Sequence, residues 1–504
     1  MSKLGKLIEG IEAVDPSAEA MEFRGQWWTW GDLRTAGQAL DQALTQAGLG
    51  ARTRVGMLMI NRPEIAASFL HIMGSGRCLV AVNASLPDER LAAEVAVLHV
   101  PALVATAEQW QREALVTAAR QAGCLGLELT GDKAAPVRLV PGLETRADDL
   151  RVYADEGVGL EMLTSGTTGT PKRIPMQSGT LEEAIVNAGA YDGRGPDAAP
   201  KLRPGVMVLH ASFAHMSGIF GITNTFVAGR KVALLEKFAV GPWADAIRRH
   251  KPKVASAPPT ALRMILDAKV PKEDLASLVA FRTGTAPLPP ELADEFTERY
   301  GIPVLQNYGA TETAGAGAGW TLDDYRQFHT TKRGSVGRLS PGIKGRVVDA
   351  ESGEPLPPGG QGLLELFGPQ LGDGKSWMRT TDLAVLDADG FLWIKGRADN
   401  AIIRGGFKIN PDDIVQAIQK HPAVREAAVV GLPDPRLGAV PAAAYVIRSG
   451  MQAPDEAEMK AFLKGLLLPY QVPVEVRAVE ALPRTPSLKV SQPELRKIFQ
   501  GAPA

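Results

Sequence analysis

The chain of 504 residues exceeds the size of one ordinary hydrophobic core, which predicts two or more domains. Its 45% hydrophobic and 22% charged residues are typical of a soluble globular protein, and its formal net charge of -1 offers no basic field for nucleic acid. Because it has only Cys78 and Cys124, no N-terminal apolar segment and no apolar run of about 18 residues, we expect no disulfide framework, zinc site, signal peptide or membrane span, and a cytoplasmic location.

The first part of the chain alternates strands with helices. Arg54 to Ile60 is a short apolar run typical of a buried strand, and Cys78 to Val82 is another. Between them, Asn61 is placed to cap a helix that has Pro63 near its first turn. This spacing predicts a βαβ unit with a parallel sheet. Further short buried strands are expected at Val206 to Leu209, Lys231 to Leu235 and Val254 to Ala257.

The segment Leu163 to Lys172 reads L-T-S-G-T-T-G-T-P-K and suits neither a helix nor a strand interior. Glycines allow close backbone approach, hydroxyls donate hydrogen bonds and Lys172 adds a charge, which together predict a loop that binds a polyphosphate. A flexible linker is disfavoured, because the segment ends in Pro-Lys and runs into an apolar stretch. A Walker loop fails on spacing, because Thr170 and Pro171 follow Gly169.

The pattern of predicted secondary structure changes twice in the second half of the sequence. From Gly334, two antiparallel pairs are expected, which predicts a small β-rich subdomain: Arg346 to Asp349 with Gly362 to Phe367, and Leu383 to Leu386 with Phe391 to Ile394. After Arg397, a compact C-terminal α+β domain is expected, with helices at Pro411 to Gln419 and Asp455 to Leu467 and a strand at Ala427 to Gly431. We therefore predict domains of residues 1–397 and 398–504. The run Gly315 to Gly319 lacks a preceding strand and reads as a mobile loop.

Other segments contain residues typical of a binding site, and each of them also has a purely structural interpretation. Gln306 to Glu312 reads Q-N-Y-G-A-T-E, where Tyr308 could stack on a purine and Glu312 could hold Mg²⁺, or the segment could be a capped strand end. Asp382 and Arg397 could clasp a ribose diol, or form a weak surface pair. Asp399 to Lys408 is glycine-rich and could be a tight hairpin, and Pro483 to Lys489, P-R-T-P-S-L-K, could end in a solvated lysine.

Taken together, in order and spacing, these segments resemble the adenylate-forming superfamily of acyl- and aryl-CoA synthetases, firefly luciferase and peptide-synthetase adenylation domains. The resemblance runs from about Gly25 to Lys489. It implies an α/β fold: a large N-terminal domain of parallel and mixed sheets with flanking helices and a small β-rich subdomain, and a small mobile α+β C-terminal domain. It also implies ATP, Mg²⁺ and CoA as ligands.

Position by position, the resemblance implies roles for the matching residues. The ATP phosphates would be wrapped by Thr164, Ser165, Gly166, Thr167, Thr168, Gly169 and Lys172. The adenine pocket would be formed by Thr283 to Pro287, including Thr285 and Ala286, with Gln306, Asn307 and Tyr308. Thr311 and Glu312 would contact the α-phosphate and Mg²⁺, and Asp382 and Arg397 would bind the ribose. Asp399 looks like the hinge, Gly405, Gly406 and Lys408 like the CoA-binding face, and Lys489 like the adenylation lysine.

The acyl pocket is expected around His210 to Gly218, with Phe213, His215, Gly284 and Gly309. Amino-acid-activating relatives place an Asp early in this segment, and its absence here argues against amino acids. Gly309 stands where acetate-specific relatives carry an indole, which leaves room for a longer acid. For His215, a satisfied core imidazole is an equally weighted alternative.

Two residues depart from the family pattern. Arg173 follows Lys172, and Leu488 precedes Lys489, where Gly is usual at both positions. Leu488 either adopts an ordinary backbone conformation or narrows the space near Lys489.

These features predict an ATP-dependent acyl-CoA ligase for a medium-chain, alicyclic or aromatic carboxylate, acting through an acyl-adenylate with release of pyrophosphate. One alternative is an acyl-AMP ligase that loads a carrier protein's pantetheine, and another is a non-catalytic nucleotide-binding module. No nucleic acid partner is expected. The oligomeric state is left open, with a homodimer as one option.

Overall fold

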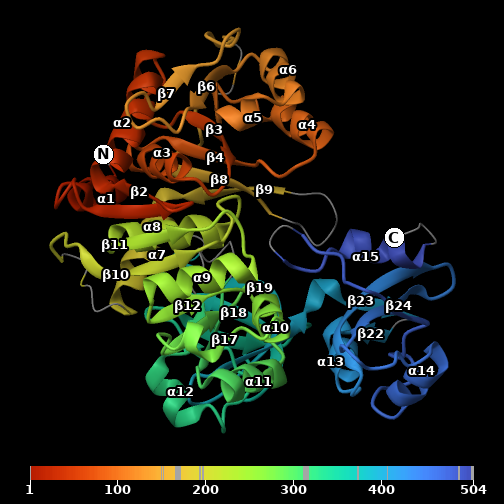
Figure 1. Cartoon of the computed structure of the whole chain (residues 1–504). Helices are drawn as coiled ribbons and strands as arrows, with labels where there is room; N and C mark the ends of the chain where they lie inside the picture. The colour runs from red at the N-terminus through yellow and green to blue at the C-terminus, as the bar shows by residue number, and fades with distance from the viewer. Residues whose placement is uncertain are drawn as a thin grey trace.

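The protein is described from a computed structural model, which covers residues 2–148, 150, 152–164, 172–191, 195, 198–309, 317–369, 371, 374–405, 407–485 and 488–500. Figure 1 shows a large body, coloured red to teal, beside a smaller blue body formed by the C-terminal part of the chain. In the described residues, the large body contains four sheets, of seven, five, four and four strands, and the smaller body contains its own five-stranded sheet.

The first sheet has seven strands in the order β7-β6-β5-β3-β4-β8-β9. Their bounds are β3 Arg54–Met59, β4 Cys78–Asn83, β5 Ala102–Thr106, β6 Leu125–Leu129, β7 Val137–Leu139, β8 Val158–Thr164 and β9 Lys172–Gln177. β3 and β4 pair in parallel across helix α3 (Pro63–Gly74), which confirms the predicted βαβ unit. The predicted cap is wrong: Arg62 occupies the cap position of α3, and the Asn61 amide bonds the carbonyls of Ala211 and Leu235 instead.

Two further sheets complete the main body. One contains β10 (Arg203–Leu209), β11 (Arg230–Leu234), β1 (Glu19–Phe23) and β2 (Gln26–Thr29). The other contains β12 (Val254–Ser256), β13 (Ala280–Thr283), β14 (Val304–Tyr308), β15 (Ala318–Gly319) and β16 (Arg338–Leu339). The strands predicted near 206, 231 and 254 are confirmed. The loop predicted for Gly315 to Gly319 is partly wrong, because Ala318 and Gly319 pair with β14 as a short antiparallel strand.

Helices pack between and around these sheets (Figure 1). Their bounds are α1 Lys3–Glu12, α2 Trp30–Gln46, α4 Asp88–Leu98, α5 Ala107–Trp110, α6 Glu113–Gln121, α7 Ser178–Tyr191, α8 Met216–Val227, α9 Val240–His250, α10 Pro259–Asp267, η1 Lys272–Leu275, α11 Pro290–Tyr300 and α12 Leu322–Phe328. Thr29 begins α2 through a capping box with Asp32, which fixes where this helix starts.

The β-rich subdomain is a four-stranded antiparallel sheet of β17 (Lys344–Val348), β18 (Gln361–Phe367), β19 (Met378–Leu386) and β20 (Leu392–Arg397). Both predicted pairs are confirmed, and β18 and β19 also pair with each other. The short helix η3 (Ala398–Asn400) then leads into the smaller body.

The smaller body contains β21 (Ile402–Arg404), β22 (Phe407–Ile409), β23 (Val424–Asp434), β24 (Gly438–Ile447) and β25 (Glu475–Ala478). Helices α13 (Pro411–Gln419), α14 (Glu456–Lys464) and α15 (Gln492–Phe499) cover this sheet. The predicted α+β composition is confirmed, although α14 ends three residues earlier than expected.

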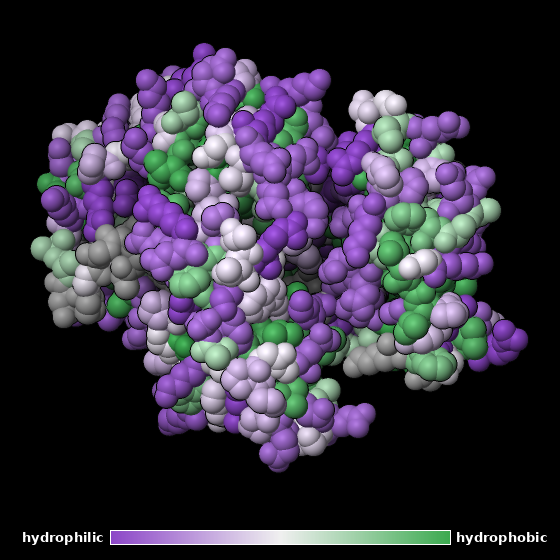
Figure 2. Space-filling view, turned by 90° about the horizontal axis from the view of Figure 1, so that it is seen from below, coloured by the Kyte–Doolittle hydropathy of each residue, from purple (hydrophilic) through white to green (hydrophobic). Residues whose placement is uncertain are grey.

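The apolar residues form separate clusters in the two bodies, so each body has its own core. Seen from below, Figure 2 shows a furrow between the larger body and the smaller one. Within the described residues, none of the helices is both long and apolar enough to cross a membrane.

Candidate nucleotide and acyl site

The predicted phosphate loop is closed at its stem by an antiparallel pair. Thr164 ends β8 and Lys172 begins β9, and the two residues are register partners. The predicted phosphate ligands Ser165, Gly166, Thr167, Thr168 and Gly169 lie outside the described residues, as do the side chains of Thr164 and Lys172. The structure therefore places the ends of the loop at one edge of the seven-stranded sheet.

Arg173 follows the loop on β9, and its guanidinium ties the stem to two other elements. Nη1 donates to the carbonyl oxygens of Ala81 on β4 and Glu161 on β8, each at 3.2 Å. Nη2 pairs with the carboxylate of Glu94 on α4, and both side chains are 17% exposed. Beside this pair lies a surface hollow of about 560 Å³. Arg173, which departs from the family pattern, thus cross-links the β8–β9 stem to β4 and α4.

The predicted adenine segments come together on neighbouring parallel strands. Thr283 at the end of β13 is the register partner of Gln306 on β14. A Cβ at position 284 would come within 2.7 Å of the exposed Asn307 side chain, so a larger residue there would require that side chain to shift. Thr285 has a positive φ of 68°. The hydroxyl of Thr283 is buried and has no hydrogen-bond partner among the described residues, which marks a polar atom available to a ligand.

Tyr308 and the predicted ribose residues also meet. The phenol of Tyr308 donates to Oδ2 of Asp382 at 2.5 Å, and burial, followed by the charge of Asp382, raises the pKa of Tyr308. Asp382 on β19 is the register partner of Arg397 on β20. Arg397 donates to Thr381 at 2.6 Å and to both carboxylate oxygens of Asp399 at 2.9 and 2.8 Å. Asp399, which was predicted as the hinge, is therefore bound by Arg397, which was predicted to contact the ribose.

The predicted acyl segment lies at the start of α8 and is fixed by Asn61. The backbone N–H of Phe213 donates to Oδ1 of Asn61 at 3.0 Å, and the Phe213 ring packs edge-on against Phe69 in the core. His210 donates from Nε2 to the carbonyl of Ser256 at 2.8 Å. Phe213 is therefore fully packed, and Gly309 lies half-buried just after β14.

His215 is not a satisfied core imidazole. Its Nε2 atom is buried and has no hydrogen-bond partner among the residues that the structure describes. Burial lowers the pKa of His215 below its usual value, and the charge of Lys489 lowers it further. The ammonium group of Lys489 thus acts on His215, although the two residues belong to different bodies. Sequence reasoning left both alternatives open, and the buried nitrogen favours contact with a ligand.

The turn that carries Lys489 docks on helix α10 of the large body. Arg484 donates from Nη1 to the hydroxyl of Thr260 at 3.1 Å and to the carbonyl of Leu488 at 2.9 Å. Arg425 pairs with Asp267 at the end of α10 at 3.4 Å. Leu488 has a φ of 63°, so of the two alternatives for this residue the ordinary backbone conformation is wrong.

Several predicted residues are not tested by the geometry. Thr311, Glu312 and Gly406 lie outside the described residues, as does the side chain of Lys408. Gly405 has a φ of 56° in the tight hairpin between β21 and β22, and its N–H donates to the Leu437 carbonyl at 2.8 Å. The alternative of a hairpin for this segment is correct, and glycine suits its left-handed position.

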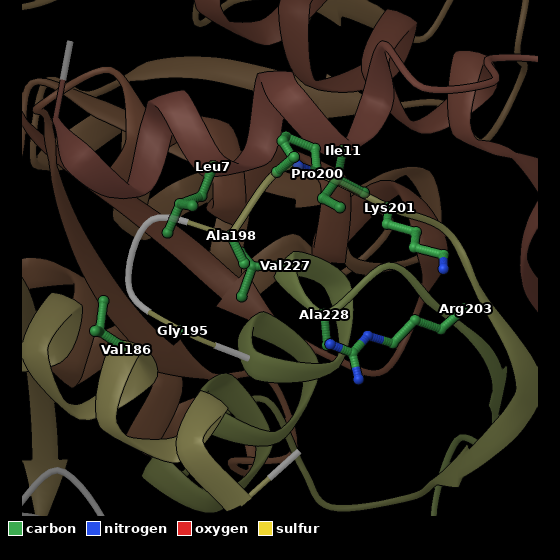
Figure 3. Close-up of a pocket in the computed structure, with 11 residues that line it drawn as sticks. Leu7, Ile11, Val186, Gly195, Ala198, Pro200, Lys201, Arg203, Val227 and Ala228 are labelled. Atoms are coloured by element: carbon green, nitrogen blue, oxygen red, sulfur yellow. The ribbon is translucent and has the colours of Figure 1, made fainter. Parts of the chain in front are cut away.

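A cavity of about 40 Å³ lies between α1, α7 and α8. Figure 3 shows residues that line it. Its lining includes Leu7, Val186 and Val227, and none of its lining residues was predicted as a site residue. The cavity is small and distant in sequence from the nucleotide segments, so we assign it no function.

Sequence reasoning missed Asn61, Thr381 and Glu94. Asn61 lies two residues after the end of β3 in a parallel sheet, close to the carboxyl edge where ligand-binding and structural polar residues gather. That signal was present in the sequence. Glu94 sits in an ordinary amphipathic helix, and only the folded structure brings it to Arg173.

The chain belongs to the AMP-binding enzyme family, part of the adenylate-forming superfamily. The model described as AMP-binding enzyme matches residues 11–374, and the model described as AMP-binding enzyme C-terminal domain matches residues 414–489. Relatives include a sulfoacetate–CoA ligase from Cupriavidus necator, 30% identical over 94% of this chain and 92% of the relative. A feruloyl-CoA synthase from an Amycolatopsis species is 30% identical over 96% of this chain and 97% of the relative.

Solved structures share the fold of this chain. ATP-bound MatB from Rhodopseudomonas palustris superposes with a TM-score of 0.82 at 24% identity, over 99% of each chain. The apo form of the same protein gives 0.69 at the same identity and coverage.

Proposed function

We propose that the protein is an ATP-dependent acyl-CoA ligase that activates a medium-chain, alicyclic or aromatic carboxylate. The carboxylate attacks the α-phosphorus of ATP, which forms acyl-AMP and expels pyrophosphate. The CoA thiol then attacks the acyl carbon, which forms the thioester and releases AMP. The observation that carries this proposal is that the turn bearing Lys489, from the C-terminal body, docks on α10 of the large body through Arg484, Leu488 and Thr260. In the large body, the buried Nε2 of His215 has no partner among the described residues.

The first step joins anionic reactants, so electrostatic stabilisation must dominate it. We assign Lys489 to bridge the attacking carboxylate and the α-phosphate as a compact charge. Neutral His215 is available to donate a hydrogen bond from its buried ring without adding a second cation. Asp382 and Arg397 hold the ribose, and Tyr308 presents its ring to the adenine. Thr164 to Lys172 hold the phosphates, and Thr311 contacts the α-phosphate.

Mg²⁺ is part of the proposal as the counterion of the ATP phosphates, with Glu312 as its carboxylate ligand. We also propose domains of residues 1–397 and 398–504 with Asp399 at the hinge. Support comes from η3, which separates the last strand of the β-rich sheet from the first strand of the C-terminal sheet. Rotation there would exchange Lys489 for the face that contains Gly405, Gly406 and Lys408.

The acid is proposed from the pocket and from the relatives. Phe213, two residues before His215, is buried in the apolar core, and Gly309 has no side chain that would limit the length of the acid. The named relatives act on sulfoacetate and ferulate, which differ widely in size and charge.

A panel of carboxylates tests the function: acetate, sulfoacetate, octanoate, cyclohexanecarboxylate, benzoate and ferulate, each with ATP, Mg²⁺ and CoA. We expect thioester and AMP from at least one of the four larger acids at a rate well above that with acetate. Pyrophosphate release without CoA thioester, recovered with a holo-carrier protein, would indicate the carrier-loading alternative. Absence of carboxylate-dependent pyrophosphate release across the panel would contradict the proposal.

A further inference from the structure

The turn before Lys489 holds Leu488 in a conformation that suits glycine. The Thr485 N–H donates to the Lys489 carbonyl at 2.8 Å, and the Leu488 N–H donates to the Thr485 carbonyl at 2.9 Å. These bonds close a tight turn in which Leu488 has a φ of 63°. Left-handed backbone is strained for a leucine, so contacts outside the turn must stabilise it.

Those contacts come from the large body. The Leu488 side chain packs against the apolar cluster built from α9, α10, α11 and the strands between them. Its carbonyl accepts from the hydroxyl of Thr260 on α10 at 3.4 Å and from Arg484 at 2.9 Å. Arg484 in turn donates to Thr260 at 3.1 Å and pairs with Glu426 of the smaller body. Side chain and carbonyl of one residue therefore join the two bodies directly beside Lys489.

We propose that Leu488 is a positioning residue that anchors the Lys489 turn on the large body and favours the arrangement for acyl-adenylate formation. A glycine at this place would fit the turn without strain but would offer no apolar contact to the cluster. With leucine, rotation of the C-terminal domain has to withdraw an apolar side chain from that cluster. The proposal rests on the proposed function, because it acts through the role of Lys489.

Half-reaction assays of Leu488→Ala and Leu488→Met test the anchor. Alanine keeps the left-handed strain and loses the apolar contact, so acyl-AMP formation should fall about tenfold, a change equivalent to ~1.4 kcal/mol. Thioester formation from supplied acyl-AMP should stay unchanged. Methionine keeps the apolar volume, so it should retain near-wild-type rates. Leu488→Gly should fall between, because it relieves the strain but loses the contact.

A second readout is independent of activity. Spin labels on Glu298→Cys in α11 and Ala457→Cys in α14 report the distance between the two bodies, while the buried Cys78 and Cys124 stay unlabelled. We expect a narrow distance distribution in the otherwise wild-type protein and in the Leu488→Met variant, and a broader distribution in the Leu488→Ala variant.

Equal loss of both half-reactions in Leu488→Ala would overturn the proposed role of Leu488. So would rates and distance distributions in Leu488→Ala that equal those of the wild-type protein. If the wild-type protein forms no acyl-AMP, the proposed function fails instead. The distance measurement would still decide whether Leu488 joins the bodies.

Discussion

At the scale of single residues, burial decides which side chains can act. His210 and His215 both lie in the acyl segment, and burial lowers the pKa of each. Their hydrogen bonding differs, because His210 bonds the Ser256 carbonyl while Nε2 of His215 has no partner among the described residues. His210 therefore fits a structural role, and His215 the role of a ligand contact.

The lowered pKa of His210 predicts a dependence of stability on pH. The unfolded chain binds a proton near the usual pKa of 6.5, whereas the folded chain resists it, so the His210 contribution to stability is lost as pH falls below that value. The loss is at most about 1.4 kcal/mol for each pH unit. His210→Gln keeps a donor for Ser256 and removes this titration. Urea unfolding midpoints at about pH 7 and about pH 5.5 should fall less in the variant than in the wild type. Equal decreases would contradict this account of His210.

At the scale of elements, strands and helices were largely predictable, because their signals are local. The apolar run at Arg54 and the proline-led helix at Pro411 each appear where the pattern places them. The errors arose where tertiary contacts decided. Asn61 bonds a distant segment rather than its own helix, and the short strand Ala318–Gly319 exists only because β14 and β16 flank it.

The β8–β9 stem gives a prediction at this scale. Arg173→Ala removes two carbonyl bonds and an ion pair beneath the phosphate loop. Because hydrogen bonds to a charged group contribute about 1.5–3 kcal/mol each, we expect the KM for ATP to rise at least about tenfold, with a smaller change in kcat.

Arg138→Ala is the matched control for this measurement. Arg138 also pairs with a glutamate across neighbouring strands of the same sheet, but its side chain is 65% exposed and lies away from the loop. Steady-state kinetics with varied ATP should show no change in the control. An unchanged KM in Arg173→Ala would show that the cross-link does not shape ATP binding.

At the scale of the whole molecule, the site depends on two bodies. Tyr308, Asp382 and Arg397 were predicted because each lies in a short local motif of the sequence. The structure brings these three residues together. The arrangement of the bodies could not be predicted in the same way. It depends on the contacts of Arg484 and Leu488 with Thr260, which lies more than 220 residues earlier in the chain. Arg484 and Leu488 belong to the terminal motif, but nothing in that motif specifies Thr260 as their partner.

In the proposed mechanism, Lys489 serves acyl-adenylate formation and not the later transfer to the thiol. The most direct measurement compares the two half-reactions in Lys489→Ala and the wild type, with the best carboxylate from the panel. In Lys489→Ala, we expect carboxylate-dependent pyrophosphate release to fall by a factor of about 100 or more, because the variant lacks an electrostatic stabiliser of the transition state. Thioester formation from supplied acyl-AMP should be retained. Equal loss of both half-reactions, or full retention of both, would contradict it.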